Sequence, residues 1–359
     1  MNNKTSTNLD LLRWIAAFTV FAFHFLWLGY TGIPREEIFH RYQMFGPLGV
    51  GIFFVLSGYV IAYVVETKHS DWRDYLRARF SRLYSVYIPA ILLTFIVDAI
   101  GRHWNAEIYE QFPAPFNIKT GARFIISILF LQENSFFSSR WLSDSPMWSL
   151  AYEFWYYILF GVAVYFRGRI RVAMMLVALF LAGWKILLLF PVWLAGVSIY
   201  HFRDRILRIS SGWRLAIFCA SLCLLVLLCT PGFFYTLQPV WALGTKIGPF
   251  GFHSLFPFYY VALPALAGIV ASCIQKDSGA SVEKSQIAVF IRWGAGSSFS
   301  LYLFHVPLIL FVRSSGIYDS KNIGQVLLAA IAVFSMAYFL ALFSEHRKKW
   351  WSVQIARFL

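Results

Sequence analysis

The first long apolar stretch of the sequence, LDLLRWIAAFTVFAFHF, carries two ionisable side chains at a defined spacing, Arg13 and His24. Eleven residues advance an α-helix by about three turns, so both side chains project from nearly the same face, about 16 Å apart along the axis. Ionisable groups at membrane depth are costly and therefore mark functional sites. Because imidazole accepts and returns protons near neutral pH, His24 is a candidate general base. The alternatives are a structural imidazole bonded across helices and an Arg13 that snorkels to the membrane interface.

Glu153 is the one acidic residue deep within another apolar run, MWSLAYEFWYYILF. At a helical rise of about 1.5 Å per residue, Glu153 and His24 each lie about 20 Å above the cytoplasmic end of their helices, so their depths coincide. A carboxylate there could fix the tautomer of the imidazole and stabilise its protonated form. The pair predicts acid–base chemistry, and a purely structural polar pair is the alternative.

Three arginines stand at the start of the third apolar run, in YLRARFSRLYSVYIP: Arg77, Arg79 and Arg82. A guanidinium group binds phosphate oxygens through two parallel hydrogen bonds, so this cluster could hold the phosphates of a large anionic donor. Anchoring at the cytoplasmic interface explains the same cluster equally well.

The composition of the chain defines the elements that must position these groups. Of 359 residues, 59% are hydrophobic and 13% are charged, and the mean hydropathy of +0.63 excludes a soluble globular protein. Recurring apolar windows predict an all-α, polytopic transmembrane bundle of about ten helices, a single domain over residues 1–359 with no soluble domain. The predicted spans are 11–29, 46–65, 83–100, 147–166, 172–186, 187–202, 213–230, 255–274, 297–316 and 323–343. The fifth and sixth are short and join through Lys185 to Pro191.

The distribution of basic residues tests this topology. They gather in segments 68–82, 167–171, 203–214, 276–292 and 347–357, which all face the side of the N-terminus in a ten-span arrangement. The positive-inside rule then places both termini in the cytoplasm and explains the net charge of +14 without nucleic-acid binding. Residues 122–132 are too short to span and are predicted to form an interfacial or re-entrant element outside. The four cysteines lie in apolar runs without metal-ligand spacing, which predicts small core residues and no metal site.

Five sequence elements together resemble a known family, the membrane acyltransferase family three, whose members are integral-membrane O-acyltransferases of bacterial surface carbohydrates. Arg13 and His24 match its Arg-x10-His signature, and GVGIFFVLSGYVIAY, with Ser57 and Tyr59, is similar to its second helix. The remaining matches are Arg79 and Arg82 in an Arg-x-x-Arg motif, MWSLAYEFWYY with Trp148, Ser149 and Glu153, and SLYLFHVPLI with Tyr302 and His305. Their order and spacing agree over roughly residues 9–346.

The resemblance implies a multi-pass protein of the bacterial inner membrane that takes acyl-CoA, usually acetyl-CoA, as cytoplasmic donor and needs no metal. The acceptor would be a hydroxyl of a cell-surface glycan or of its lipid-linked intermediate. Arg79 and Arg82, with Arg13, would hold the phosphates of coenzyme A, His24 would deprotonate the acceptor hydroxyl, and Glu153 would orient His24 or the acceptor. The other motif residues, expected to bind substrate or support the motifs, are Ser57, Tyr59, Trp148, Ser149, Tyr302 and His305.

Some alternatives stay open at this point. Neither motif serine lies in a G-x-S-x-G elbow, so a serine acyl-enzyme is not expected. Larger family members carry an additional extracytoplasmic domain, so we expect either the stand-alone form or a chain that works with a separate extracytoplasmic partner, and a homo-oligomer is a further alternative. A proton-coupled transporter or exporter would use Arg13, His24 and Glu153 as a proton relay. An acyl translocator would pass the acyl group to a separate transferase.

Overall fold

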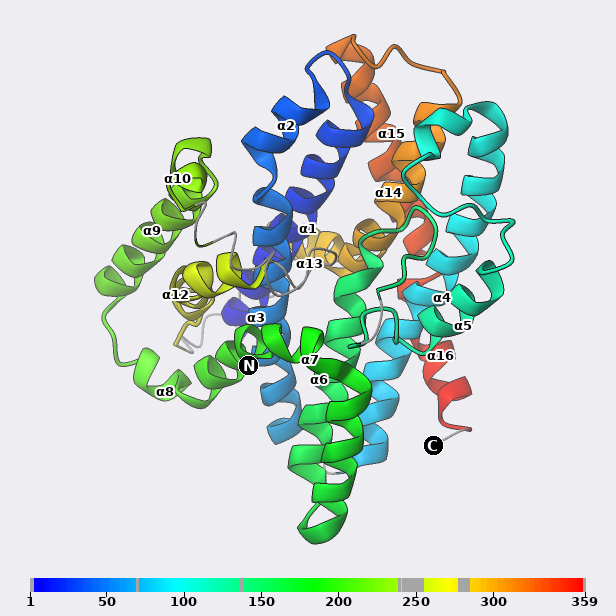
Figure 1. Cartoon of the computed structure of the whole chain (residues 1–359). Helices are drawn as coiled ribbons and strands as arrows, with labels where there is room; N and C mark the ends of the chain where they lie inside the picture. The colour runs from blue at the N-terminus through cyan, green and yellow to red at the C-terminus, as the bar shows by residue number, and fades with distance from the viewer. Residues whose placement is uncertain are drawn as a thin grey trace. The chain divides into compact units, whose positions relative to one another are not determined.

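The computed structural model is all-helical over the residues that it describes, which are 3–68, 71–135, 138–237, 240, 255–276 and 285–357. This confirms the predicted fold class (Figure 1). The long helices are α1 (Asn3–Gly29), α3 (Phe45–Thr67), α4 (Trp72–Trp104), α6 (Met147–Tyr165), α7 (Gly168–His201), α9 (Ser211–Leu228), α12 (Phe256–Ser272), α14 (Ser298–Ser314) and α15 (Ile323–Ala341). The shorter ones are α2 (Arg35–Tyr42), α5 (Thr120–Ile128), α8 (Arg203–Ile206), α10 (Pro231–Thr236), α13 (Gln286–Gly296), α16 (Lys348–Ile355) and the 3-10 turns η1 (Ala106–Tyr109) and η4 (Glu345–Arg347).

Each of the ten predicted windows coincides with a helix, but fewer helices qualify as membrane spans. Among the described residues, six helical stretches are long and apolar enough to cross a membrane, and a seventh is added if α13 and α14, bent by 51°, form one span. The count of ten is higher because windows 172–186 and 187–202 are two parts of α7, and because α6 and α12 do not meet this criterion. The cytoplasmic placement of both termini stays a prediction.

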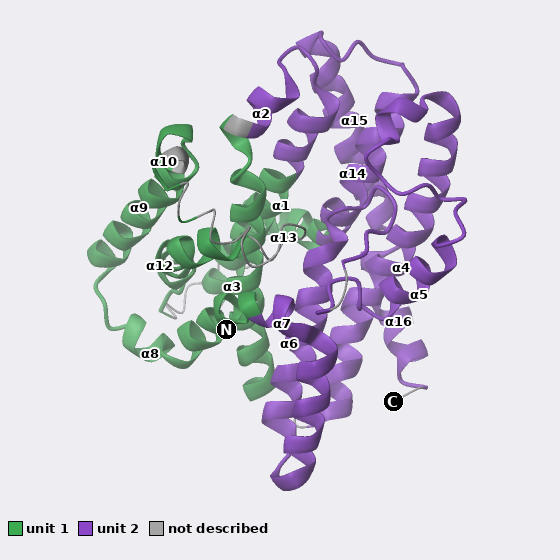
Figure 2. Ribbon diagram, viewed as in Figure 1, with its two compact units in different colours: residues 1–20, 40–70, 188–298 green, residues 21–39, 71–187, 299–359 purple. Residues whose placement is uncertain are grey.

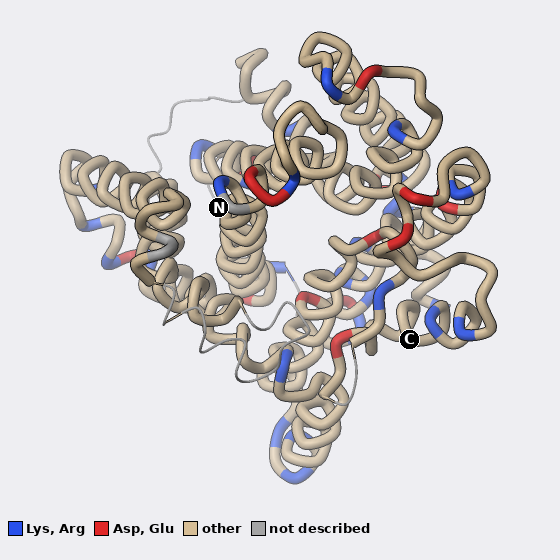
Figure 3. Tube along the Cα trace, turned by 45° about the horizontal axis from the view of Figure 1, so that its top comes forward, with Lys and Arg blue, Asp and Glu red and all other residues tan. Residues whose placement is uncertain are grey.

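Figure 3 shows that charged residues occupy short parts of the trace, singly or in small groups, with long uncharged stretches between them. Lys284, one of the basic residues used for the topology, lies outside the described residues, as does the rest of 277–284. The interfacial segment predicted at 122–132 contains the short helix α5, whose Phe124 and Ile125 side chains are exposed. The prediction of core cysteines is wrong for Cys219 and Cys223, whose side chains are exposed on α9.

The chain forms two compact units, each assembled from segments that are distant in sequence (Figure 2). Unit 1 comprises residues 1–20, 40–70 and 188–298, and unit 2 comprises residues 21–39, 71–187 and 299–359. In unit 1, α3 packs on α12, and α12 packs on α9. In unit 2, α4 packs on both α6 and α16.

Helix α7 is broken at Gly183, where the backbone adopts φ 78° and ψ 163°, a conformation that is open essentially only to glycine. The segment after α5 satisfies the polar groups on either side of the break. Asn134 Nδ2 donates to the carbonyl of Leu181 at 2.9 Å, and Ser135 Oγ accepts from the amide of Trp184 at 3.0 Å. The stretch from Lys185 to Pro191, through which the two predicted spans join, is itself helical, and the break precedes it.

Two polar anchors in unit 2 fix the starts of helices that carry motif residues. Asp71, eight residues before Arg79, caps the N-terminus of α4 by accepting a hydrogen bond from the amide of Arg73 at 3.2 Å. Glu345 accepts from the amide and the hydroxyl of Ser300, at 3.0 and 3.1 Å, near the start of α14. Backbone amides near the starts of α4 and α14 are thus satisfied by side chains rather than by water.

Candidate active site

Two histidines meet inside unit 2. Nε2 of His305, on α14, lies 3.1 Å from Nδ1 of His24, on α1, and the two ring centroids are 5.0 Å apart. His305 is fully buried, whereas His24 keeps part of its surface exposed. Phe21 and Phe23 pack against the edges of the two rings. His24 is therefore the member of the pair that a ligand can reach.

The backbone of α14 determines which ring atoms carry protons. Nδ1 of His305 lies 3.0 Å from the carbonyl oxygen of Leu301, and a carbonyl only accepts, so this nitrogen is the donor. A buried imidazolium is costly, so the resting ring is neutral and its Nε2 is an acceptor. The bond to His24 then requires a proton on Nδ1 of His24, so in the neutral form of this imidazole Nε2 is unprotonated. That tautomer is the one that a general base needs.

A second polar contact joins α14 to α6. The hydroxyls of Tyr302 and Ser149 are 2.7 Å apart, and the Tyr302 ring packs against that of His305, one turn further along α14. Ser149, Glu153 and Tyr157 are spaced by four residues and so lie along one face of α6. Both Glu153 and Tyr157 are buried, and Tyr157 donates its hydroxyl hydrogen to the Glu153 carboxylate.

The Arg-x-x-Arg motif occupies the beginning of α4, next to this face of α6. Arg79 is buried, with 8% of its surface exposed, and it interacts electrostatically with Glu153, Tyr157 and Arg82. Nε of Arg79 has no hydrogen-bond partner among the described residues, and neither arginine forms an ion pair there. Arg82 instead covers the ring of Phe299 at 4.7 Å. A buried guanidinium with unused donors is typical of a site that receives an anion.

Three predicted site residues belong to unit 1, so their roles at the site stay predictions. Arg13 forms an ion pair with Asp10 at 3.1 Å. Ser57 accepts a hydrogen bond from Trp193 Nε1 at 3.2 Å, and buried Tyr59 packs edge-on against Tyr200. Gly58, between them, allows α3 to approach the backbone of Trp193 more closely than any side chain would permit.

The structure also brings forward residues that the sequence did not single out. Trp148, expected as a motif residue, is buried against Tyr152. Asp144, three residues before α6, is also buried, although no sequence motif marks it. Burial, together with the nearby carboxylate of Asp98, raises the pKa of Asp144 well above its ordinary value. Asp144 also interacts electrostatically with Tyr302. Its position in SDSP reads as a turn, so only its burial reveals it.

The site contains no arrangement for a metal ion within the described residues, where no group of three or more His, Cys, Asp or Glu side chains is suitably placed. What it contains is a histidine pair with a defined tautomer, a buried carboxylate and a buried guanidinium. These are the parts for proton transfer and for binding an anionic ligand.

Sequence comparison identifies the class of protein to which this site belongs. Residues 6–344 match the acyltransferase domain that defines the acyltransferase 3 family, and the chain is a member of that family of membrane acyltransferases. The resemblance carried by the five motifs is thus confirmed over nearly the whole chain.

Curated relatives of the chain are distant. An "Acyltransferase MdmB" of Streptomyces mycarofaciens is 28% identical over 170 residues, which cover 43% of this chain and 38% of the relative. An "O-acetyl transferase" of Shigella phage Sf6 is 27% identical over 164 residues, or 44% of this chain and 46% of the relative. The matches thus span less than half the length of these relatives. No solved structure matches the chain.

Proposed function

We propose that this protein is an O-acyltransferase of the bacterial inner membrane. It moves an acetyl or other short acyl group from cytoplasmic acyl-CoA to a hydroxyl of a cell-surface glycan or of its lipid-linked intermediate. The observation that carries the proposal is the hydrogen bond between His24 and His305 in a member of an acyltransferase family. The phage relative is named an O-acetyl transferase, which supports acetyl as the group transferred.

His24 acts as the general base in this mechanism. Its unprotonated Nε2 takes the proton of the acceptor hydroxyl while the oxygen attacks the thioester carbonyl carbon. The new C–O bond forms, the C–S bond breaks, and the proton passes from His24 to the departing thiolate of coenzyme A. His305 accepts from Nδ1 of His24 throughout and stabilises the imidazolium that forms transiently. No atom or electron is left over, and the resting tautomer is restored after each turnover.

Arg79 and Arg82 are proposed to bind the phosphates of coenzyme A. A charge-assisted bidentate contact would give the buried Arg79 guanidinium the partner that its Nε lacks among the described residues. The Glu153 carboxylate interacts electrostatically with Arg79 and accepts a hydrogen bond from the Tyr157 hydroxyl. Glu153 would orient the donor-side arginine and also His24 or the acceptor.

The proposal is tested by acetyl transfer from radiolabelled acetyl-CoA into glycan, with the purified protein and a defined acceptor. We expect His24→Ala to bind acetyl-CoA with wild-type affinity and to transfer label about 100- to 10,000-fold more slowly, the usual contribution of a general base. His103→Ala, which removes an exposed histidine of α4, is the matched control and should transfer at the wild-type rate.

Any of three results would overturn the proposal. Near wild-type transfer by His24→Ala shows that His24 is structural. Binding of acetyl-CoA by the wild type without transfer to any acceptor, unless a second protein is added, indicates the acyl translocator. Transport that needs no acetyl-CoA indicates the transporter.

A further inference from the structure

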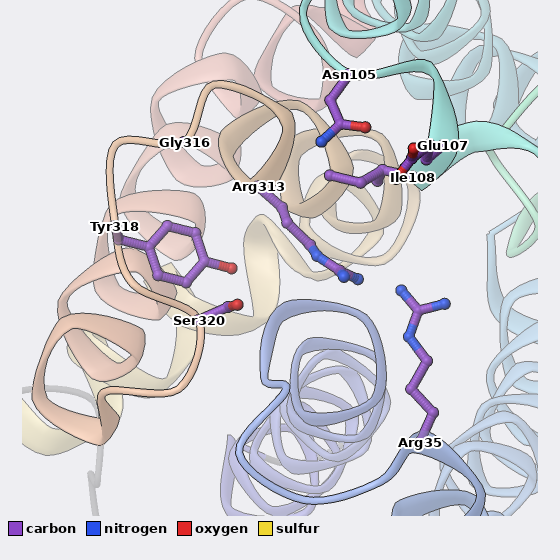
Figure 4. Close-up of a pocket in the computed structure, with 8 residues that line it drawn as sticks. All are labelled: Arg35, Asn105, Glu107, Ile108, Arg313, Gly316, Tyr318 and Ser320. Atoms are coloured by element: carbon purple, nitrogen blue, oxygen red, sulfur yellow. The ribbon is translucent and has the colours of Figure 1, made fainter.

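Unit 2 contains a polar pocket with a volume of about 460 Å³. It lies where α2 begins, where α4 ends and where the loop after α14 passes, and Figure 4 shows its lining side chains. The polar ones are Arg35, Asn105, Glu107, Arg313, Tyr318 and Ser320. None of them belongs to the site described above.

The two arginines of this pocket present an unusual charge arrangement. Their guanidinium groups point toward each other across the pocket, and they repel each other electrostatically (Figure 4). Neither forms an ion pair within the described part of the chain. Burial lowers the pKa of Arg35, because it partly desolvates the charged guanidinium. Two like charges held together beside a cavity are stabilised when an anion occupies it.

The surrounding contacts hold the arginines in place without neutralising them. Arg313 Nη1 donates to the carbonyl oxygen of Leu28 at 2.7 Å, which leaves its other N–H groups available. The hydroxyl of Tyr318 donates to the carbonyl oxygen of Gly29 at 2.7 Å. Both carbonyls belong to the C-terminal end of α1, so the pocket wall is fixed to the helix that carries His24.

The pocket lies at the opposite end of α4 from the Arg-x-x-Arg motif. Arg82 and Asn105 are separated by 23 residues of this helix, or about 35 Å, roughly the thickness of a bilayer core. Because α4 is long and apolar enough to cross a membrane, the pocket would lie on the side opposite to the proposed donor site.

The pocket is also close to the histidine pair. Leu28, which Arg313 contacts, is one helical turn from His24 on α1, or about 6 Å. On α14, Arg313 follows His305 by eight residues, or about 12 Å. A ligand held by the arginines would therefore extend toward the imidazole that can reach substrate.

We propose that this pocket binds an anionic group of the acceptor, a carboxylate or a phosphate carried by the glycan or its lipid carrier. Arg35 and Arg313 would bind the oxyanion, while the exposed Asn105 and Glu107 side chains are available for neighbouring sugar hydroxyls. The inference rests on the proposed function for the identity of the ligand, but the anion site itself does not.

Binding of small probes to the purified full-length protein in nanodiscs tests the site directly. The probes are radiolabelled glucuronate for a carboxylate source, pyrophosphate for a phosphate source, and glucose as the neutral comparison. We expect at least one anion to bind at least about tenfold more tightly than glucose, and Arg35→Gln to weaken it at least about tenfold. Lys321→Gln, an exposed charge of the same loop outside the pocket, is the matched control and should leave binding unchanged.

Arg313→Gln is a second variant, but Arg35→Gln carries the test because Arg35 makes no hydrogen bond that the fold needs among the described residues. In the transfer assay, Arg35→Gln should raise KM for an acidic acceptor about tenfold with little change in kcat. The inference is overturned if the anions and glucose bind equally well, or if Lys321→Gln weakens anion binding as much as Arg35→Gln does. In either case, acetyl transfer by the wild type would leave the proposed function standing. Anion binding without acetyl transfer to any acceptor overturns the proposed function, and the acceptor assignment with it.

Discussion

Replacing His24 and His305 singly and together should give losses of activity that do not multiply. His305 is proposed to act only through the bond that its Nε2 makes with Nδ1 of His24, at 3.1 Å. In the His24→Ala variant this hydrogen bond cannot form, so His305 has no imidazole to orient. His305→Ala should therefore reduce transfer strongly in the wild-type background and hardly at all in the His24→Ala background.

The magnitudes follow from the geometry. Loss of a general base lowers the rate about 100- to 10,000-fold. Removing a buried hydrogen-bond partner costs about 1–3 kcal/mol, which corresponds to about 5- to 150-fold in rate. The double variant should match His24→Ala within about twofold, which gives a coupling energy of about 1–3 kcal/mol between the two residues.

The assay is a comparison of kcat/KM for acetyl transfer, converted to activation free energies for the four proteins of the cycle. Because His305 is fully buried, thermal unfolding and acetyl-CoA binding must first show that each variant is folded. His305→Gln is the conservative control, since its amide oxygen can still accept from Nδ1 of His24, and it should retain more activity than His305→Ala. A double variant whose loss equals the product of the single losses would refute the reasoning, because His305 would then act independently of His24.

Three further predictions concern donor binding, folding and pH. Arg79→Gln should weaken acetyl-CoA binding at least about tenfold, because it removes a buried charge-assisted contact. Arg77→Gln, at an exposed residue of the same helix, is the control and should leave binding unchanged. Equilibrium binding measurements test this, and equal effects of the two variants would contradict the assignment. Gly183→Ala should destabilise the protein by at least about 1 kcal/mol, seen as a lower Tm, because φ 78° disfavours any Cβ, while Gly212→Ala, with open space around it, should leave Tm unchanged. Burial raises the pKa of Glu133 from 4.5 to about 7, so the native state binds more protons than the unfolded chain between these values. Stability should therefore fall by up to about 3 kcal/mol as pH rises through that window, and the Tm of Glu133→Gln minus that of the wild type should be larger at pH 8 than at pH 5; an equal difference would show that Glu133 does not titrate there.

Local pattern was sufficient to predict the helices and part of the site. His24 and Glu153 stand out because an ionisable residue within an apolar run is conspicuous in any sequence. The four-residue spacing of Glu153 and Tyr157 also places them on one face of a helix, and this spacing alone predicts their contact.

What the sequence could not provide are the contacts between helices. His305 was expected to bind substrate or to support its motif, and its contact with His24 was not predicted because no local rule brings together residues that are 281 positions apart. The break in α7 at Gly183 was not predicted, for a related reason. Pro191 is the more obvious helix breaker, but the helix tolerates it, whereas Gly183 meets the loop segment around Ser135 and adopts a backbone conformation that other residues avoid.

The pairing of His24 with His305 also has a consequence for biosynthesis. Closing a contact across 281 residues requires nearly the whole of the intervening chain, so the base cannot acquire its fixed tautomer until α14 has left the ribosome and entered the bilayer. Early helices inserted alone would contain His24 without its partner. A nascent chain interrupted before α14 would then be unable to consume acyl-CoA, and catalytic competence would appear only late in membrane insertion.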